Sequence, residues 1–480
     1  MTTQTIATLG LDEVLVAAET AFESWSAVPS AGRARHLEAM AAAMEVHADE
    51  LIQLAIAETH LPFARLRGEL TRTVFQLRFF AEELRGGRFV DARIDHSDPE
   101  WPMGAPRPDL RRMLLPLGPV LVFAASNFPF AFSVGGGDTA SALAAGCPVI
   151  VKAHHGHPEL SARTAAIFLD ALEESGAPAG VLALIHGTET GIQALKDPRI
   201  QAGAFTGGIP GGRALFDIAQ QRDVPIPFFA EMGSNNPVFV TPGAAAERPA
   251  ALAEGYLAAV TGSAGQLCTK PGTLFVPAGS QILGHVRTAE LPSATRLLTE
   301  RIEAGYSREV AELADHRKVR ILSGNIPSES AGPAPLILAT DIAAVLENPD
   351  LFLAERFGPF SLVVEYEDMN QLLMVARRLD GQLTATVQAT DQCDVHQLLR
   401  VLAGKAGRVL WNSWPTGVSV THAQQHGGPY PASTAVQTTS VGTAAIQRFL
   451  RPVALQGFPD HLLPPELKDS NPFEVPRHLG

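Results

Sequence analysis

The amino-acid sequence predicts an α/β protein with two doubly wound domains and a small β arm. The chain of 480 residues is too long for one ordinary core, so at least two domains are expected. From Gly118 onwards, short apolar runs typical of strands alternate with helix-like stretches. Because these runs are apolar throughout, they indicate parallel sheets that helices cover on both faces.

The expected elements follow in order along the chain. Residues 11–85 carry apolar side chains at helical spacing, with breaks at "AVPSAG" and "THLPF". Residues 88–117 form two extended segments around a Pro-rich middle, which predicts a two-stranded excursion. The strands of the first domain are "PVLVFAAS", "PVIVK", "GVLALIHG", "IQAGAFTG" and "IPFFAEMG". Those of the second are "PVFVT", "TLFVP", "PLILAT", "FSLVVEY", "LTATVQAT" and "GRVLWNS", and the join falls near Gly233.

Composition and charge exclude several classes of function. The formal charge of −13 disfavours nucleic acid and an anionic membrane as main partners. The first residues do not resemble a signal peptide, and the longest apolar stretch, "LLPLGPVLVFAAS", is too short and broken for a membrane span. The three cysteines show neither disulfide nor metal-ligand spacing, so we expect free thiols, no metal and a cytoplasmic location.

Polar residues follow the first two buried strands of the first domain. Ligands bind outside the carboxyl ends of parallel strands, where loops lead into helices. Asn127 in "ASNFPF" either donates a hydrogen bond to a developing oxyanion or makes a turn before Phe128. Lys152 ends "CPVIVK" and either holds a ribose or phosphate oxygen or is a solvated charge. The adjacent "HHGHP" has no carboxylate or thiol at ligand spacing, which argues against a metal site.

The next two strand ends carry glycines and a carboxylate. The glycines of "FTGGIPGGR", Gly207, Gly208 and Gly211 among them, allow a backbone to approach a pyrophosphate at a helix N-terminus, although the G-x-G-x-x-G fingerprint is absent. Glu231 in "FFAEMG" comes straight out of an apolar strand. It is either a general base or a structural acid between the domains.

Three further candidates lie in loops of the second half. Cys268 in "TGSAGQLCTKPG" is a nucleophile if nearby donors favour its thiolate, and otherwise a packing residue. Glu355 in "ERFGPF" either binds the paired hydroxyls of a sugar or caps a turn. His426 in "HAQQHGGPYP" either faces a pocket or is an ordinary loop histidine.

The order of these motifs resembles the aldehyde dehydrogenase superfamily along nearly the whole chain. The motifs are "ASNFPF", "VIVK", "FTGG", "AEMG", "GQLCTKPG" and "ERFGPF". The resemblance implies that Cys268 attacks an aldehyde to give a thiohemiacetal and then, after hydride transfer, a thioester. It implies that Asn127 and the backbone N–H of Cys268 form the oxyanion hole. Glu231 would activate the water that hydrolyses the thioester.

The resemblance also implies a bound NADP or NAD. Lys152 and Glu355 would hold the two riboses. Gly208 stands where the family usually has a serine that touches the pyrophosphate. His155, three positions after Lys152, stands where many NAD-preferring members carry a glutamate that repels a 2′-phosphate, so the resemblance favours NADP or dual use. The residues assigned to the cofactor are Lys152, His155, Gly207, Gly208, Gly211, Met232, Glu355 and Phe357.

In domain terms, the resemblance implies a Rossmann-type cofactor domain, an α/β catalytic domain and an oligomerisation arm. Residues 1–87 and 118–232 would form the cofactor domain and residues 233–425 the catalytic domain. Residues 88–117 and 452–480 would form the arm, and residues 426–451 would return to the cofactor domain. Such an arm suggests a homodimer or a homotetramer.

Within the superfamily, the segments around Asn127 and His426 are most similar to one branch. It holds α-ketoglutaric semialdehyde (2,5-dioxopentanoate) dehydrogenases and NADP-linked fatty aldehyde dehydrogenases of luminous bacteria, and a histidine like His426 lies near the cysteine there. Oxidation of α-ketoglutaric semialdehyde to 2-oxoglutarate is therefore the first hypothesis. Long-chain fatty or other aliphatic and aromatic aldehydes are the alternative. A hydrolase that pairs Cys268 with His422 or His426 is a remoter one, and Glu231 argues against a coenzyme A-dependent enzyme.

Overall fold

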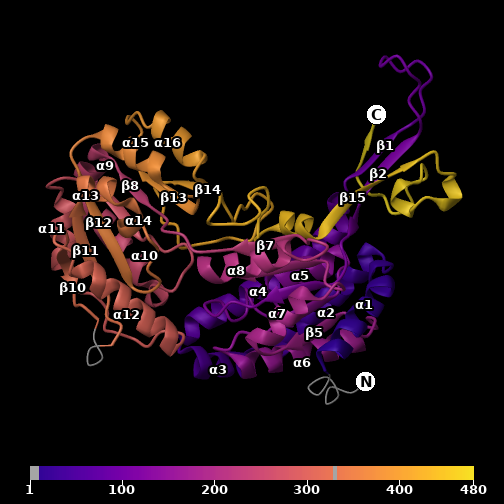
Figure 1. Cartoon of the computed structure of the whole chain (residues 1–480), viewed down its shortest axis with the longest axis horizontal. Coiled ribbons are helices and arrows are strands. Elements are labelled where there is room, and N and C mark those ends of the chain that lie inside the picture. Colours follow the sequence, from indigo (N-terminus) through magenta and orange to yellow (C-terminus); the bar gives the residue numbers. More distant parts are fainter. Residues whose placement is uncertain (1–9, 328–331) are drawn as a thin grey trace.

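Two α/β units and a projecting β arm make up the molecule (Figure 1). Each unit, called the first or the second layer below, is a sheet with its covering helices. The computed structural model describes residues 10–327 and 332–480. The predicted α/β class is confirmed, while residues 1–9, which belong to the predicted cofactor domain and to the segment compared with signal peptides, lie outside the described part. No described helix combines the length and the apolar character that a membrane span requires.

The first layer is built on a five-stranded sheet in which all strands are parallel. Its order is β5-β4-β3-β6-β7. Its strands are β3 (Val120–Phe123), β4 (Val149–Lys152), β5 (Leu182–Ile185), β6 (Ala202–Thr206) and β7 (Phe228–Glu231). The strand order reverses between β3 and β6, which is the place where such sheets bind ligands.

Helices cover both faces of this sheet because its side chains alternate between two cores. Val120 and Val122 belong to the core under α2, α4, α5 and α6, whereas Leu121 and Phe123 belong to the core under α1, α7 and α8. The helices are α1 (Leu11–Ser26), α2 (Ser30–Val46), α3 (Ala48–Thr59), α4 (Phe63–Gly86), α5 (Gly137–Ala145), α6 (Pro158–Glu174), α7 (Thr188–Lys196) and α8 (Ile209–Gln220). The helical stretch from Leu11 also breaks at His47, where neither Pro nor Gly signals it.

The second layer contains a seven-stranded sheet in the order β10-β11-β12-β9-β8-β13-β14. Its strands are β8 (Val238–Val240), β9 (Thr273–Pro277), β10 (Arg320–Gly324), β11 (Leu336–Asp341), β12 (Phe360–Tyr366), β13 (Gln382–Gln388) and β14 (Ala406–Trp411). Its helices are α9 (Pro242–Glu247), α10 (Pro249–Thr261), α11 (Gln281–Thr288), α12 (Glu300–Ala314), α13 (Ile342–Glu347), α14 (Pro349–Phe352), α15 (Met369–Arg378) and α16 (His396–Ala403). β10 was not predicted, because this edge strand is largely exposed and lacks a continuous apolar run. It runs antiparallel to β11.

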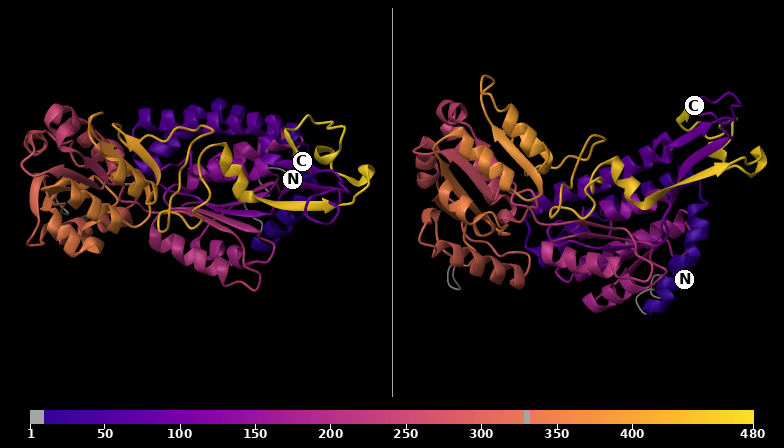
Figure 2. Two further views of the ribbon diagram at one scale, coloured as in Figure 1. Left: turned by 90° about the horizontal axis from the view of Figure 1, so that it is seen from above. Right: turned by 45° about the horizontal axis from the view of Figure 1, so that its top comes forward.

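The arm is a four-stranded sheet that projects away from both layers (Figures 1 and 2). Its order is β15-β2-β1-β16, with β1 (Ala92–Asp95), β2 (Leu110–Pro116), β15 (Leu450–Gln456) and β16 (Arg477–Leu479). It joins segments from the first quarter and the last part of the chain. Short 3₁₀ helices complete the structure: η2 (Arg88–Val90), η3 (Gly262–Gly265), η4 (Thr443–Phe449), η5 (Asp460–Leu462) and η6 (Pro465–Leu467).

The segment between β14 and the arm runs back along the free edge of β7. Met232 N–H donates to the carbonyl of Ala432 at 2.8 Å, and Thr434 N–H donates to the carbonyl of Ala230 at 3.1 Å. Further on, Arg448 in η4 forms a buried ion pair with Asp138 in α5, with 2.8 Å between Nη2 and Oδ1. These contacts fix the returning segment to the first layer.

The buried pair predicts a large stability difference. Arg448→Met leaves the Asp138 carboxylate buried without its partner, so we expect a loss of about 3–5 kcal/mol and a clearly lower melting temperature in a thermal scan. Arg78→Met breaks an exposed pair with Glu45 and should cost about 0–1 kcal/mol. Equal losses in the two variants would contradict this assignment, and Asp138→Asn added to Arg448→Met should restore part of the stability.

Candidate active site

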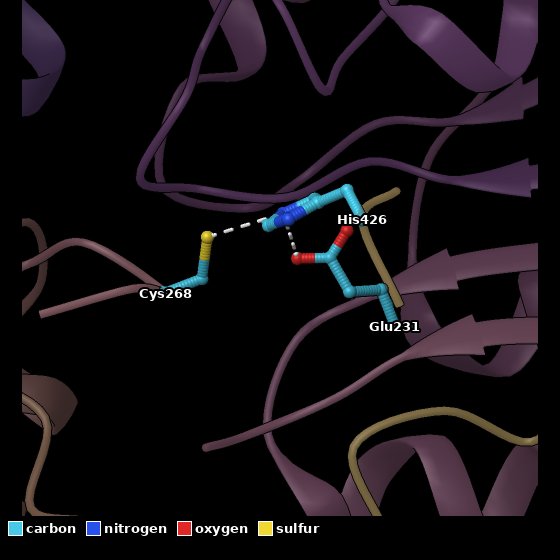
Figure 3. Close-up of side chains that lie close together, drawn as sticks. All are labelled: Glu231, Cys268 and His426. Carbon is cyan, nitrogen blue, oxygen red and sulfur yellow. Dashed lines mark hydrogen bonds and ion pairs between the residues drawn. The ribbon is translucent and has the colours of Figure 1, made fainter. Parts of the chain in front are cut away.

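Three side chains from distant segments meet at the carboxyl edge of the first sheet (Figure 3). Glu231 ends β7, Cys268 lies in the loop between η3 and β9, and His426 lies on the returning segment. Cys268 Sγ is 3.5 Å from His426 Nε2, and this nitrogen is 2.9 Å from Glu231 Oε1. The structure therefore brings these three sequence-predicted residues into one cluster, whose donor atoms also lie close enough together to hold a metal ion.

The loop that carries Cys268 has an unusual backbone. Ser263, Ala264 and Gly265 all adopt left-handed conformations, with φ of 52°, 51° and 67°. A Cβ at Gly265 would collide with the backbone of Gly358, so only glycine fits there. From the other side, Asn236 Nδ2 donates to the carbonyl of Cys268 at 2.8 Å and to that of Lys270 at 3.0 Å. The sequence reasoning missed Asn236, although it stands in "GSNNP" shortly after Glu231.

The Glu231 carboxylate is buried but ionised. Burial favours a raised pKa, yet the His426 ring together with hydrogen bonds from His426, Ser440 and Cys268 outweighs it, so the pKa of Glu231 is lowered. Ser440 Oγ donates to Glu231 Oε2 at 2.6 Å. Ser440 stands in a Thr- and Ser-containing stretch that gave no signal in the sequence. The carboxylate can accept a proton because its neighbours stabilise its charge.

The Cys268 thiol differs from the sequence expectation of a stabilised thiolate. Burial and the negative charge of Glu231 raise its pKa well above the ordinary value, and the charge of Arg72 opposes this only weakly. The thiol is therefore protonated at neutral pH. A nucleophilic role requires that its proton leave during the reaction, and the adjacent ionised carboxylate of Glu231 is able to accept it.

Asn127 lies against the Cys268 loop, four residues after β3. Its side-chain Nδ2 donates to the backbone carbonyl of Gln266 at 3.2 Å. The backbone carbonyl of Asn127 accepts a hydrogen bond from Arg65 at 3.0 Å. A side-chain amide has two N–H groups, so one donor remains for another acceptor near Cys268. Asn127 thus keeps one side-chain N–H group available beside the Cys268 loop.

Two predicted cofactor residues lie at the end of β4. Lys152 is buried, which lowers its pKa, and among the described residues its ammonium group has no hydrogen-bond or ion-pair partner. His155 is exposed and stacks on His154 with 4.3 Å between ring centroids. Burial, Lys152 and Arg301 lower the pKa of His155. An ammonium group without a protein partner, at the end of a largely buried side chain, is available to an anionic or hydroxylic ligand.

Glu355 lines a cavity that reaches the start of α8, next to the glycine-rich loop. Gly208 is the N-cap of α8, Gly211 lies in its first turn, and Gly207 N–H donates to the Glu231 carbonyl at 3.1 Å. A cavity of about 250 Å³ is lined by Glu355 together with Ile209 at the start of α8. Burial raises the pKa of Glu355 to about 7, against the opposing charge of Lys270.

The two remaining predicted cofactor residues are placed differently. The Met232 side chain is buried in the core beneath α8, where a Cβ on Gly212 would meet its sulfur. Its backbone N–H is already bonded to Ala432. Phe357 is half-buried and packs against the core of the first layer. The Met232 side chain thus packs against α8 within the core.

Similarity to known proteins extends along almost the whole chain. The sequence pattern of the Aldehyde dehydrogenase family matches residues 2–451. The chain belongs to the aldehyde dehydrogenase family. It is 45% identical to the α-ketoglutaric semialdehyde dehydrogenase 2 of Azospirillum brasilense, over 96% of this chain and 89% of that protein. It is 42% identical to the α-ketoglutaric semialdehyde dehydrogenase of Acinetobacter baylyi, over 97% and 90%.

Solved structures confirm the aldehyde dehydrogenase fold. A 1-pyrroline-5-carboxylate dehydrogenase from Thermus with bound NAD is similar with a TM-score of 0.77 and 22% identity, over 93% of this chain and 85% of that chain. An NADP-dependent enzyme of E. coli is similar with a TM-score of 0.78 and 23% identity, over 93% and 90%.

The site of this aldehyde dehydrogenase fits a dinucleotide. The family oxidises small-molecule aldehydes with NAD or NADP. The unpaired ammonium of Lys152 and the first turn of α8 offer positive charge and free N–H groups to ribose and phosphate oxygens. Family membership favours this chemistry over the hydrolase alternative.

Removal of the Glu231 charge should change thiol reactivity and turnover in opposite directions. In Glu231→Gln the negative charge that raises the pKa of Cys268 is absent, so the thiolate fraction at pH 8 increases. We expect alkylation by iodoacetamide, followed by mass spectrometry of the Cys268 peptide, to be about tenfold faster. We expect kcat to fall about 10²- to 10⁴-fold because the base is lost. Slower alkylation in this variant would show that Glu231 does not raise the pKa of Cys268.

Proposed function

We propose that this aldehyde dehydrogenase oxidises α-ketoglutaric semialdehyde to 2-oxoglutarate. The observation that carries the substrate assignment is the similarity of 45% and 42%, over nearly the whole chain, to two proteins named for this activity. The cluster of Cys268, Glu231 and His426 supports the chemistry. Long-chain and other uncharged aldehydes are the alternative substrates.

The first half-reaction forms a thioester on Cys268. The thiol passes its proton to the Glu231 carboxylate, and the sulfur attacks the aldehyde carbon. The resulting oxyanion accepts hydrogen bonds from Asn127 Nδ2 and from the backbone N–H of Cys268. NAD or NADP, held by Lys152, Glu355 and the glycine-rich loop, would supply the acceptor for the hydride that leaves this carbon. The carbonyl group re-forms, so the product on the enzyme is a thioester.

The second half-reaction releases the acid. Once Glu231 has lost its first proton to solvent, it accepts a proton from a water molecule. The water oxygen attacks the thioester carbon, the C–S bond breaks, and the carboxylic acid leaves with the Cys268 sulfur as thiolate. His426 Nε2 lies within reach of both the sulfur and the carboxylate, so its N–H orients Glu231 and stabilises the thiolate.

We propose that residues at the strand ends and in the glycine-rich loop hold the cofactor. Lys152 binds the adenine-side ribose and Glu355 the nicotinamide-side ribose. The backbone at Gly207, Gly208 and Gly211 binds the pyrophosphate, and a Cβ at Gly208 would meet only Pro210, at 3.9 Å. NADP, or dual use of both cofactors, is favoured because His155 puts no negative charge beside Lys152.

We also propose that the protein is a cytoplasmic homo-oligomer. The projecting four-stranded arm supports a homodimer or a homotetramer formed through residues 88–117 and 452–480. Three free cysteines support a cytoplasmic protein.

The aldehyde spectrum tests the proposed reaction. NADP and NAD reduction is measured with 2,5-dioxopentanoate, short aliphatic aldehydes and long-chain aldehydes. We expect the highest kcat/KM with 2,5-dioxopentanoate. Cys268→Ala should abolish turnover, since no other group in the cluster can form the thioester. Full activity in this variant would overturn the mechanism, and a preference for long-chain aldehydes would overturn the substrate.

The cofactor preference depends on position 155. In His155→Glu a carboxylate would bind the 2′-hydroxyl of NAD and repel the 2′-phosphate of NADP, so the KM for NADP should rise at least about tenfold relative to that for NAD. His155→Gln, which adds no charge, is the control. A wild-type KM that is much lower for NAD than for NADP would refute the NADP assignment.

A further inference from the structure

Arg72 in α4 is a half-buried cation that pairs with no anion among the described residues. Its Nη1 is buried and has no hydrogen-bond partner, and its Nε donates only a long hydrogen bond of 3.5 Å to the Val418 carbonyl. Among the described residues, Arg72 forms no ion pair. A guanidinium group removed from water needs a compensating partner, and a carboxylate fits its planar donor pattern best.

The guanidinium group of Arg72 lies near the reaction centre. Its Cζ lies 5.6 Å from the centroid of the Phe132 ring, and that ring lies 6.2 Å from the ring of His426. His426 in turn contacts Cys268. Arg72 lies within electrostatic range of Glu69, Glu231 and Cys268. The cation is therefore close enough to the nucleophile to hold the far end of a short substrate.

We propose that Arg72 binds the carboxylate of an ω-carboxy aldehyde while Cys268 attacks the aldehyde at the other end. This inference rests on the proposed oxidation of 2,5-dioxopentanoate, whose carboxylate lies roughly 5 Å from its aldehyde carbon, as C–C bonds of about 1.5 Å dictate. Arg72 also offsets the repulsion that the ionised Glu231 exerts on an anionic substrate. Apolar side chains form a cluster beside it that suits the methylene groups: Phe79, Phe128, Phe132, Val418 and Val420.

Two other arginines near the site are already engaged. Arg65 donates to Glu69, to Ser263 Oγ at 3.1 Å and to the Asn127 carbonyl at 3.0 Å. Arg408 donates through Nη1 and Nη2 to the carbonyls of Gly417 and Pro415 at 2.7 and 2.8 Å. Arg72 alone of the three keeps a buried terminal nitrogen without a partner.

The test compares two aldehydes that differ only in the carboxylate. Glutaric semialdehyde and pentanal both have five carbons, and the ratio of their kcat/KM values measures recognition of the charge. We expect Arg72→Met to lower this ratio about 100-fold, chiefly through KM for the acid, and Arg72→Lys to lower it less because the charge remains. Arg78→Met removes a positive charge from the exposed side of the same helix and should leave the ratio unchanged.

The outcomes separate the anchor from the proposed function. An unchanged ratio in Arg72→Met, or the selective loss in Arg408→Met instead, would overturn the role of Arg72. If Arg72→Met does not fold, Arg72→Lys decides. A lower ratio of the two kcat/KM values in Arg72→Lys supports the anchor, and an unchanged ratio overturns the proposal. A wild-type enzyme that oxidises glutaric semialdehyde well and 2,5-dioxopentanoate poorly would refute the proposed substrate and leave the anchor standing.

Discussion

The buried carboxylate of Glu231 is the charge on which the arrangement of the active site depends. Burial disfavours this charge, and His426 and Ser440 compensate for it through hydrogen bonds of 2.9 and 2.6 Å. Both partners come from the returning segment. The carboxylate, in turn, raises the pKa of Cys268. The site thus holds an ionised carboxylate and a protonated thiol in direct contact.

A protonated thiol has a chemical advantage in such a site. Thiolates are the form that oxidants and alkylating agents attack, so a thiol with a raised pKa is less exposed to such damage between turnovers. The rigid loop around Cys268, with three consecutive left-handed residues on one side and the Asn236 hydrogen bonds on the other, keeps the sulfur in place. In the proposed mechanism, loss of the thiol proton activates Cys268 without any movement of the loop.

The sequence predicted most of the fold because its strands are apolar on both faces. It failed at β10, an exposed edge strand with polar residues, and at the break near His47, where no Gly or Pro marks the boundary. It identified Cys268, Glu231 and Asn127 from their order along the chain, although roles for single residues stay predictions. Ser440, Asn236 and Arg72 could not be found in this way. Asn236 contacts Cys268, 32 positions away, and Ser440 contacts Glu231, 209 positions away. Arg72 stands out because its Nη1 has no partner. Neither a distant contact nor a missing partner leaves a local pattern in the sequence.

The returning segment also has a consequence for synthesis of the chain on the ribosome. β7 is the last strand of its sheet, and residues 432–434 cover its free edge through hydrogen bonds to Ala230 and Met232. These residues emerge some two hundred positions after β7, so the nascent first layer exposes an open strand edge beside a carboxylate that still lacks His426 and Ser440. Water must hydrate that carboxylate until the segment arrives. An emerging chain is consequently inactive until almost its entire length has been translated, and its open edge is the place where chaperones have most to protect.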